Sequence, residues 1–159
     1  MTRITSEEPK DHWGFLKIKD KVILDLGCGL FHSTISTHQW FIDNGASKVI
    51  GIDLGTEIEY PKFIYHAMAI DNTQKIKGLI ETYKPDIIKC DIEGAEIHFN
   101  GIESADLYNV NEIALEYHNN ELRDLIFDKL ADWDFALLNI YQLFDIDTET
   151  MGVIHAVKM

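Results

Sequence analysis

The chain has little positive charge. Its 14 lysines and arginines stand against 27 aspartates and glutamates, which gives a formal net charge of −13 over 159 residues. A nucleic-acid binder replaces counterions with a basic stripe, so this balance argues against a nucleic-acid partner. It argues against an anionic membrane surface for the same reason. The charges are spread along the sequence, which is typical of a solvated acidic surface.

Long apolar runs and cysteines are also scarce. No stretch is long enough to span a bilayer, and the opening "MTRITSEEPKDHW" lacks the pattern of a signal peptide. The two cysteines, Cys28 and Cys90, are expected to be reduced thiols, because no export signal precedes them. These features predict a cytoplasmic protein with no membrane partner.

No internal repeat, low-complexity run or linker divides the chain. Hydrophobic residues make up 46% of it, which is enough to build a core. We therefore expect one domain over residues 1–159, with a short N-terminal segment at 1–20 and a core at 21–159.

Apolar and amphipathic runs alternate through this core. The pattern predicts strands at 22–26, 48–53, 63–70, 86–91 and 110–118, and helices near 33–45, 72–85 and 119–135. Such alternation is typical of an α/β fold with a parallel sheet and helices on both faces. Two β-like segments, 135–144 and 152–159, are separated by a hairpin loop and should be antiparallel. Residues 54–62 are too few for a full helix, so a loop or single turn is expected there.

The stretch "KVILDLGCGLFHSTIS" places a glycine-rich turn between a strand and a helix. In such sheets ligands bind beyond the carboxyl ends of the strands. A dinucleotide motif needs a third glycine where this chain has His32, and no Gly-Lys-Ser/Thr follows for a P-loop. The turn therefore indicates a different ligand, or glycines needed only for backbone shape.

Two carboxylates narrow the choice of ligand. Asp25 precedes the glycines Gly27 and Gly29, and its charge suits an ammonium group. Asp53 ends the next strand, where a carboxylate can accept both hydroxyls of a ribose. A nucleoside with an amino-acid tail satisfies both ends, which predicts S-adenosylmethionine as the cofactor.

These motifs also resemble a known family. "VILDLGCG" followed by "VIGID" resembles the first two motifs of class I S-adenosylmethionine-dependent methyltransferases. "IIKCDIEGAEIHFNGIESAD" followed by "EIALEYH" resembles the FkbM family. The signature residues are Lys89, Asp91, Glu93, Gly94, Ala95 and Glu96, then Glu116 and His118. The resemblance implies a Rossmann-like seven-stranded sheet in the order 3-2-1-4-5-7-6, and O-methylation of hydroxyls on sugars and natural products.

The resemblance also implies the cofactor site. Its expected residues are Asp25, Gly27, Cys28, Gly29, Phe31, Asp53, Leu54, Ala69, Ile70, Asp71 and Asp91. Phe31 stands where the first motif usually has a third glycine and is expected to cover the methionine moiety. Asp71 is expected near the adenine amino group.

Four ionisable residues are expected to converge beside the sulfonium: Asp91, Glu93, Glu116 and His118. Three interpretations stay open. His118 or Asp91 removes the acceptor proton, or Asp91, Glu116 and His118 bind a divalent cation. In the third, Glu93 and Glu96 cap a helical turn and His118 bonds a loop.

The leading hypothesis is an S-adenosylmethionine-dependent O-methyltransferase with a small-molecule hydroxyl acceptor. The alternatives are a cofactor-binding protein without transfer, such as a regulatory or partner subunit, and an enzyme that consumes the cofactor without a methyl acceptor. The segment before the first core strand is short, so "PKDHWGF" or a second subunit is expected to complete the acceptor pocket. An oligomer therefore stays possible.

Overall fold

The computed structural model describes residues 2–4, 8–29, 37–142 and 151–159. Its strands are β1 (Thr2–Arg3), β2 (Val22–Leu26), β3 (Lys48–Asp53), β4 (Ile58–Tyr60), β5 (Phe63–Ala67), β6 (Ile87–Cys90), β7 (Glu112–Tyr117), β8 (Phe135–Gln142) and β9 (Gly152–Lys158). Its α-helices are α1 (Pro9–Trp13), α2 (Thr37–Asp43), α3 (Thr73–Tyr83) and α4 (Asn120–Asp132), with 3₁₀ helices η1 (Ala95–Gly101) and η2 (Ser104–Leu107).

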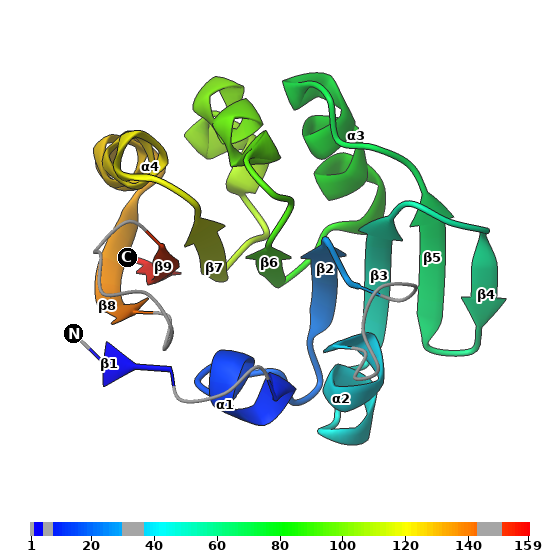
Figure 1. Ribbon diagram of the computed structural model, residues 1–159. Coiled ribbons are helices and arrows are strands. Elements are labelled where there is room, and N and C mark those ends of the chain that lie inside the picture. The colour runs from blue at the N-terminus through cyan, green and yellow to red at the C-terminus, as the bar shows by residue number, and fades with distance from the viewer. Residues whose placement is uncertain (1, 5–7, 30–36, 143–150) are drawn as a thin grey trace.

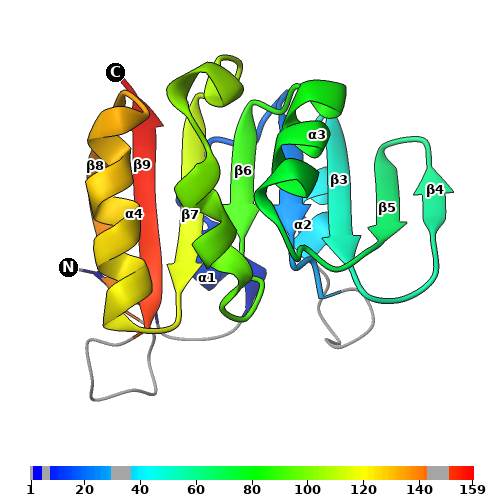
Figure 2. The same cartoon turned by 90° about the horizontal axis from the view of Figure 1, so that it is seen from above.

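The strands form one nine-stranded sheet in the order β1-β8-β9-β7-β6-β2-β3-β5-β4. The strands β7, β6, β2, β3 and β5 run parallel, and β9 lies antiparallel between β7 and β8 (Figure 2). The expected order of the seven core strands and the antiparallel last pair are confirmed. The carboxyl ends of the parallel strands therefore meet at one edge of the sheet.

Two short edge strands were not expected. The prediction of only a loop or turn over residues 54–62 is wrong, because Ile58–Tyr60 forms β4, antiparallel to β5. This three-residue strand is half-buried to exposed and lacks the apolar pattern that reveals strands in a sequence. At the opposite edge, β1 pairs in parallel with β8.

The helices begin and end close to where the sequence predicts. The Asn72 side chain accepts a hydrogen bond from the Lys75 backbone N–H at 3.0 Å and starts α3. Asn119 starts α4 through the Leu122 N–H at 2.8 Å. The N-cap expected at Ser33 lies outside the described residues. No described helix combines the length and apolar character needed to cross a membrane.

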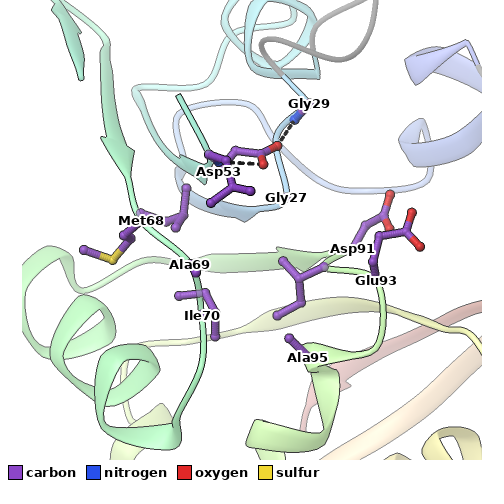
Figure 3. A pocket seen from close by; sticks show the side chains of 12 residues that line it. Gly27, Gly29, Asp53, Met68, Ala69, Ile70, Asp91, Glu93 and Ala95 are labelled. Atoms are coloured by element: carbon purple, nitrogen blue, oxygen red, sulfur yellow. Dashed lines mark hydrogen bonds between the residues drawn. The ribbon is translucent and has the colours of Figure 1, made fainter. Parts of the chain in front are cut away.

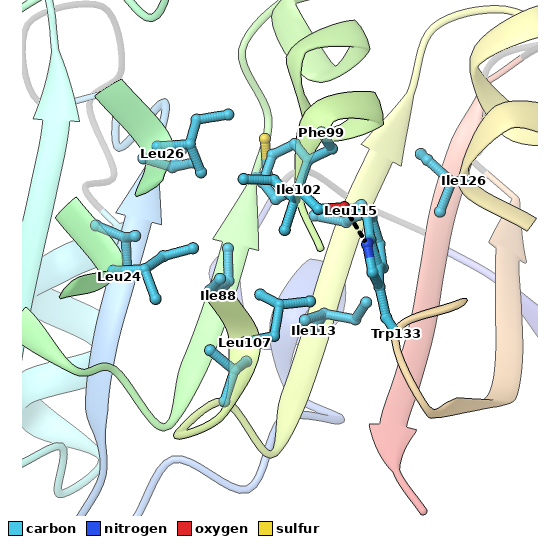
Figure 4. Close-up of a cluster of buried hydrophobic side chains, with 14 of the residues drawn as sticks. Leu24, Leu26, Ile88, Phe99, Ile102, Leu107, Ile113, Leu115, Ile126 and Trp133 are labelled. Atoms are coloured by element: carbon cyan, nitrogen blue, oxygen red, sulfur yellow. Dashed lines mark hydrogen bonds between the residues drawn. The ribbon is translucent and has the colours of Figure 1, made fainter. Parts of the chain in front are cut away.

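Helices cover both faces of the sheet, with α3 and α4 on one side and α1 and α2 on the other (Figure 1). The α3/α4 face buries the larger apolar cluster, drawn in part in Figure 4. There Trp133 is fully buried and donates its Nε1–H to the Ile102 carbonyl at 2.9 Å. A second cluster joins Ile23 and Ala114 to Trp13 on the opposite face. Successive strand residues alternate between these two layers.

Candidate functional site

A cavity of about 450 Å³ lies beyond the carboxyl ends of β2, β3, β5 and β6 (Figure 3). The residues that line it are Gly27, Gly29, Ile52, Asp53, Leu54, Met68, Ala69, Ile70, Asp91, Ile92, Glu93 and Ala95. From β2 the chain adds β3 and β5 on one side and then β6 and β7 on the other, so the cavity sits at the switch point between β2 and β6, where open α/β sheets bind ligands. Its size suits a small molecule.

The glycine turn after β2 forms one wall. Gly27 has a φ of +74° and Gly29 a φ of +67°, in the left-handed region that favours glycine. A Cβ on Gly27 would lie 1.6 Å from the Asp91 carbonyl oxygen, so no larger residue fits between β2 and β6 there. The glycine at position 27 is thus required by the neighbouring strand as well as by the turn.

Asp53 ends β3 and fixes the same turn from the other side. Its Oδ2 accepts the Gly29 N–H at 2.8 Å, shown as a dashed line in Figure 3, and its Oδ1 accepts the Leu54 N–H at 2.7 Å. A carboxylate oxygen has a second lone pair, so both can still accept from a ligand hydroxyl. The side chain stands at the cavity wall.

Seven of the eleven expected cofactor residues line the cavity: Gly27, Gly29, Asp53, Leu54, Ala69, Ile70 and Asp91. Three others are described but do not. The Asp71 carboxylate is 3.0 Å from Lys75 Nζ and 61% exposed. Cys28 is buried, and Asp25 is fully buried. Phe31 lies outside the described residues.

Asp25 faces the protein interior and not the cavity. Its Oδ1 is 2.9 Å from Lys89 Nζ, and its Oδ2 accepts the Thr37 hydroxyl at 2.6 Å. The expected direct contact with a ligand ammonium group does not fit this arrangement, because Lys89 already neutralises the carboxylate. Burial alone would lower the pKa of Lys89, but the carboxylates of Asp25 and Asp91 hold it above its usual range. Lys89 therefore stays protonated.

His118 follows β7 and lies among four carboxylates. Its Nε2 is 3.6 Å from Asp91 Oδ1, 3.8 Å from Glu93 Oε2 and 3.7 Å from Glu116 Oε1. Its Nδ1 is 3.3 Å from Glu96 Oε1. The structure thus brings Asp91, Glu93 and Glu116 together around His118. Asp91 and Glu93 also line the cavity, so the cluster joins its wall.

The turn "DIEGAE" after β6 brings Glu96 into this cluster. Glu93 and Gly94 have φ values of +54° and +94°, and the tight turn directs backbone N–H groups inward. Glu96, at 0% exposure, accepts those of Ile92 at 3.0 Å and Gly94 at 2.7 Å. Burial alone would raise the pKa of Glu96, but these bonds and His118 lower it. Glu96 thus holds the turn before η1 and contacts His118, while η1 itself starts after Gly94 without a side-chain cap.

The cluster sets the protonation of its two central groups. Burial raises the pKa of Asp91 to about 6, against the Lys89 ammonium and with help from the Glu116 carboxylate. The close contact with the Glu96 carboxylate, followed by the charge of Glu116, raises the pKa of His118 to about 9 although burial opposes the shift. His118 is therefore a cation at neutral pH, while Asp91 titrates close to neutrality.

Helix α1 adds one residue to the cluster and one to its surroundings, and sequence reasoning gave neither of them that role. His12 of α1 places its Nε2 3.2 Å from Glu116 Oε2, and the neighbouring Trp13 ring covers Lys89 Nζ at 4.9 Å from its centroid. The segment "PKDHWGF" thus reaches the site. His12 gave no signal, because its partner is 104 residues away. The pairing of Lys89 with Asp25 did leave a signal in the sequence, because each is a charged residue inside an apolar strand. The two residues lie opposite each other in the register of β2 and β6.

Three side chains offer a metal-ligand geometry. One ligand atom each from Asp91, Glu96 and His118 lies within 4.8 Å of the others. This set contains Glu96 where the sequence prediction had Glu116. Glu96 already accepts two backbone hydrogen bonds, and His118 would have to lose its proton before it could bind a cation. The donor types suit a divalent cation, but His118 lies within ion-pair distance of four carboxylates, and its raised pKa favours the imidazolium.

No protein family and no curated protein matches the sequence. Solved structures do match. The tRNA m1A22 methyltransferase of B. subtilis has a TM-score of 0.62 at 15% identity, over 98% of this chain and 67% of its own. Magnesium protoporphyrin IX methyltransferase from Synechocystis PCC 6803, crystallised with S-adenosylmethionine, has a TM-score of 0.60 at 14% identity, over 90% and 72%. The fibrillarin pre-rRNA processing protein of Methanococcus jannaschii has a TM-score of 0.57 at 14% identity, over 90% and 69%.

These neighbours correct the exclusion of nucleic acid, which was wrong. Two of the three proteins, by their names, act on RNA. Net charge sums over the whole surface, whereas a bound strand feels the charges within a Debye length of about 8 Å. The total of −13 therefore cannot decide the partner. What the likeness establishes is architecture: this chain has the Rossmann-like α/β fold of S-adenosylmethionine-dependent methyltransferases.

Proposed function

We propose that this protein is an S-adenosylmethionine-dependent methyltransferase that acts on a hydroxyl group. One observation carries the proposal. The glycine turn and Asp53 form one wall of the cavity, and the facing wall contains Asp91, which belongs to the cluster around His118. A cofactor site and a group able to take a proton therefore adjoin. The signature residues from Lys89 to Glu96, with Glu116 and His118, support an FkbM-like member of this class.

We assign the cofactor's ribose to Asp53, whose carboxylate oxygens stand at the cavity wall. The adenine ring is assigned to the apolar side formed by Met68, Ala69 and Ile70. The methionine end then points toward Asp91. The sulfonium gains from this placement, because the adjoining carboxylates favour a cation.

Asp91 is the better candidate for the base. His118 already carries its proton at neutral pH, whereas Asp91 has a pKa near 6, is 31% exposed and lines the cavity. In the proposed step the acceptor hydroxyl gives its proton to Asp91. The oxygen forms a bond to the methyl carbon as the carbon–sulfur bond breaks, and the electron pair stays on sulfur, which leaves S-adenosylhomocysteine. His118 holds Asp91 and Glu116 in place by charge.

The carboxylates also favour one acceptor chemistry. Two acidic side chains of the cluster, Asp91 and Glu93, line the cavity and can accept hydrogen bonds from hydroxyls, which suits a sugar or another polyhydroxylated small molecule. A divalent cation held by Asp91, Glu96 and His118 is the competing way to acidify such a hydroxyl.

An RNA acceptor is a second candidate, favoured by a specific surface feature. A groove of about 460 Å³ between the segment after α1 and helix α2 is lined by Lys17, Lys19, Lys21 and Trp40. No acidic side chain is among the described residues that line it, and of its three lysines Lys21 lies 3.5 Å from Asp86 Oδ1. Lysines beside a partly exposed aromatic ring form the usual platform for single-stranded nucleic acid. Two of the fold neighbours are named for RNA substrates.

Labelled cofactor tests these proposals. Calorimetry with S-adenosylmethionine and S-adenosylhomocysteine should show one site, with NAD as the negative control. Transfer of the labelled methyl group is then assayed on hydroxylated small molecules and on RNA. Binding with no transfer to any acceptor indicates a binding protein, and loss of cofactor without methylated product indicates an enzyme that consumes it. Absence of binding by folded protein contradicts the proposal.

A chelator separates the two ways of activating the hydroxyl. A rate that falls with chelator and returns with magnesium or manganese supports a bound cation. A rate indifferent to both supports Asp91 as the base.

A further inference from the structure

Lys89 is buried under the glycine turn. It lies within β6 at 1% exposure, and Asp25 stands opposite on β2 at 0%. Its Nζ is 2.9 Å from Asp25 Oδ1 and donates to the Gly27 carbonyl oxygen at 2.6 Å. The Trp13 ring covers it at 4.9 Å. A carboxylate, a carbonyl and an aromatic ring therefore surround the ammonium.

Stability alone does not account for this arrangement. A buried ion pair loses as much hydration as it gains in attraction, and a pair of apolar residues of similar volume often stabilises a core equally well. The apolar replacement lacks one thing that Lys89 has, which is a donor for the Gly27 carbonyl. What Lys89 adds beyond an apolar side chain is therefore a hydrogen bond that holds the glycine turn.

The turn is held from several directions at once. The Gly27 N–H donates to the Ile52 carbonyl at 2.8 Å, and the Gly29 N–H donates to Asp53 at 2.8 Å. Both bonds tie the turn to β3. Lys89 adds the tie to β6, and through Asp25 and the Thr37 hydroxyl it also reaches the start of α2.

We propose that Lys89 is a positioning residue for the cofactor: by holding the Gly27 carbonyl it fixes the glycine turn in the conformation that binds the ligand. This inference rests on the proposed function for the identity of the ligand. Lys89 does not line the cavity and takes no part in the chemistry. Its effect passes through Gly27, which does line it.

The test is a double variant, Asp25→Asn with Lys89→Met, which removes both charges together. The matched control removes another buried pair on the same face of the sheet, Glu112→Gln with His155→Gln. There the atoms are 2.7 Å apart, both side chains are 6% exposed, and neither residue lines the cavity. We expect the first double variant to melt near the wild-type temperature and to bind S-adenosylmethionine about tenfold more weakly. The control should bind as wild type does.

Amide hydrogen exchange without ligand gives a second readout. Exchange at Gly27, Cys28 and Gly29 should accelerate in the first double variant and not in the control, with the α4 amides unchanged in both. If the first double variant fails to fold, Lys89→Arg replaces it. This variant keeps the positive charge but has a larger, planar guanidinium group, so it should fold and bind the cofactor more weakly.

The inference is overturned if the first double variant shows both wild-type affinity and wild-type exchange. If Lys89→Arg has to replace that variant, wild-type affinity in Lys89→Arg overturns it. Wild-type protein that binds no cofactor overturns the proposed function instead, and the exchange comparison still tests the role of Lys89.

Discussion

The two faces of the sheet bury different chemistry. Under α3 and α4 the strands present a continuous apolar layer that includes Ile113 and Leu115 of β7. Under α1 and α2 the same strand presents Glu112 and Glu116. The buried pairs on that face are Asp25–Lys89, Glu112–His155 and Glu116–His12. Strand alternation keeps the two sets of residues on opposite sides.

The difference separates stability from function. Apolar burial stabilises the fold in proportion to area, while buried charges give up hydration and contribute little net stability. Three of the charged residues, Asp25, Lys89 and Glu116, end near the cavity or the cluster beside it. We therefore expect substitutions on the α3/α4 face to lower the free energy of unfolding. Substitutions on the α1 face should instead lower cofactor affinity or methyl transfer.

The largest effect is expected at the cluster itself. Asp91→Asn and His118→Ala should lower methyl transfer by a factor of about 10²–10⁴, because a base or its charge partner is lost. Cofactor affinity should stay within a few-fold of wild type, because Asp53 and the glycine turn remain. The exposed Asp128→Asn on α4 is the control, and wild-type turnover in both cluster variants on an identified acceptor would show that the cluster is only structural.

Two tryptophans compare the faces directly. Trp133→Ala removes a fully buried ring and its bond to Ile102, and it should lower the free energy of unfolding by about 3–5 kcal/mol. Trp13→Ala should lower the free energy of unfolding by less, because Trp13 belongs to a helix of only five residues. It should weaken cofactor binding, because it exposes Lys89. Urea denaturation and calorimetry measure the two effects. Equal losses of both properties in both variants would remove the distinction between the faces.

A smaller effect is expected within the cofactor site. Asp53→Ala should weaken S-adenosylmethionine binding by roughly 1–3 kcal/mol, the usual cost of removing a charged hydrogen-bond partner. Asp71→Ala is the matched comparison, since its carboxylate is paired with Lys75 and does not line the cavity. We expect no change there. Weaker binding in Asp71→Ala would restore the adenine contact expected from the sequence.

The smallest effect is a pH dependence of stability with two opposite signs. The pKa of His118 is raised to about 9, so its stabilising contribution is complete below about pH 6.5 and disappears as the pH rises through 9. The stability deficit of His118→Asn should shrink over that range. The pKa of Asp91 is raised to about 6, so its ionisation destabilises the fold, and Asp91→Asn should gain on wild type between about pH 4 and 6. Melting temperatures across pH 4–9.5 test both; parallel curves would contradict them.

Much of the fold follows from the sequence, because buried parallel strands appear as apolar runs that end in charged or glycine residues. The convergence of Asp91, Glu93, Glu116 and His118 followed from the same logic, since the ends of parallel strands share one edge. The edge strand β4 did not follow, because its three residues are held by pairing with β5 and not by burial.

The direction of individual side chains was harder to predict. Asp25 was assigned to a ligand, although strand alternation places it on the face opposite Leu24 and Leu26, beside Lys89. His12 was beyond sequence reasoning, since nothing local to "PKDHW" specifies a carboxylate on β7. Contacts between distant segments depend on how the helices and strands pack together. The sequence pattern of a single helix or strand does not specify that packing.

The contact between His12 and Glu116 has a consequence for synthesis on the ribosome. The two residues are 104 positions apart, and β1 pairs with β8 across an even longer stretch. At a translation rate of about 5–20 residues per second, α1 waits roughly 5–20 seconds for its carboxylate partner. For the first part of that interval Trp13 also has no Lys89 on β6 to cover. Helix α1 therefore docks late, and the nascent chain exposes an aromatic side chain to chaperones until β6 and β7 have been made.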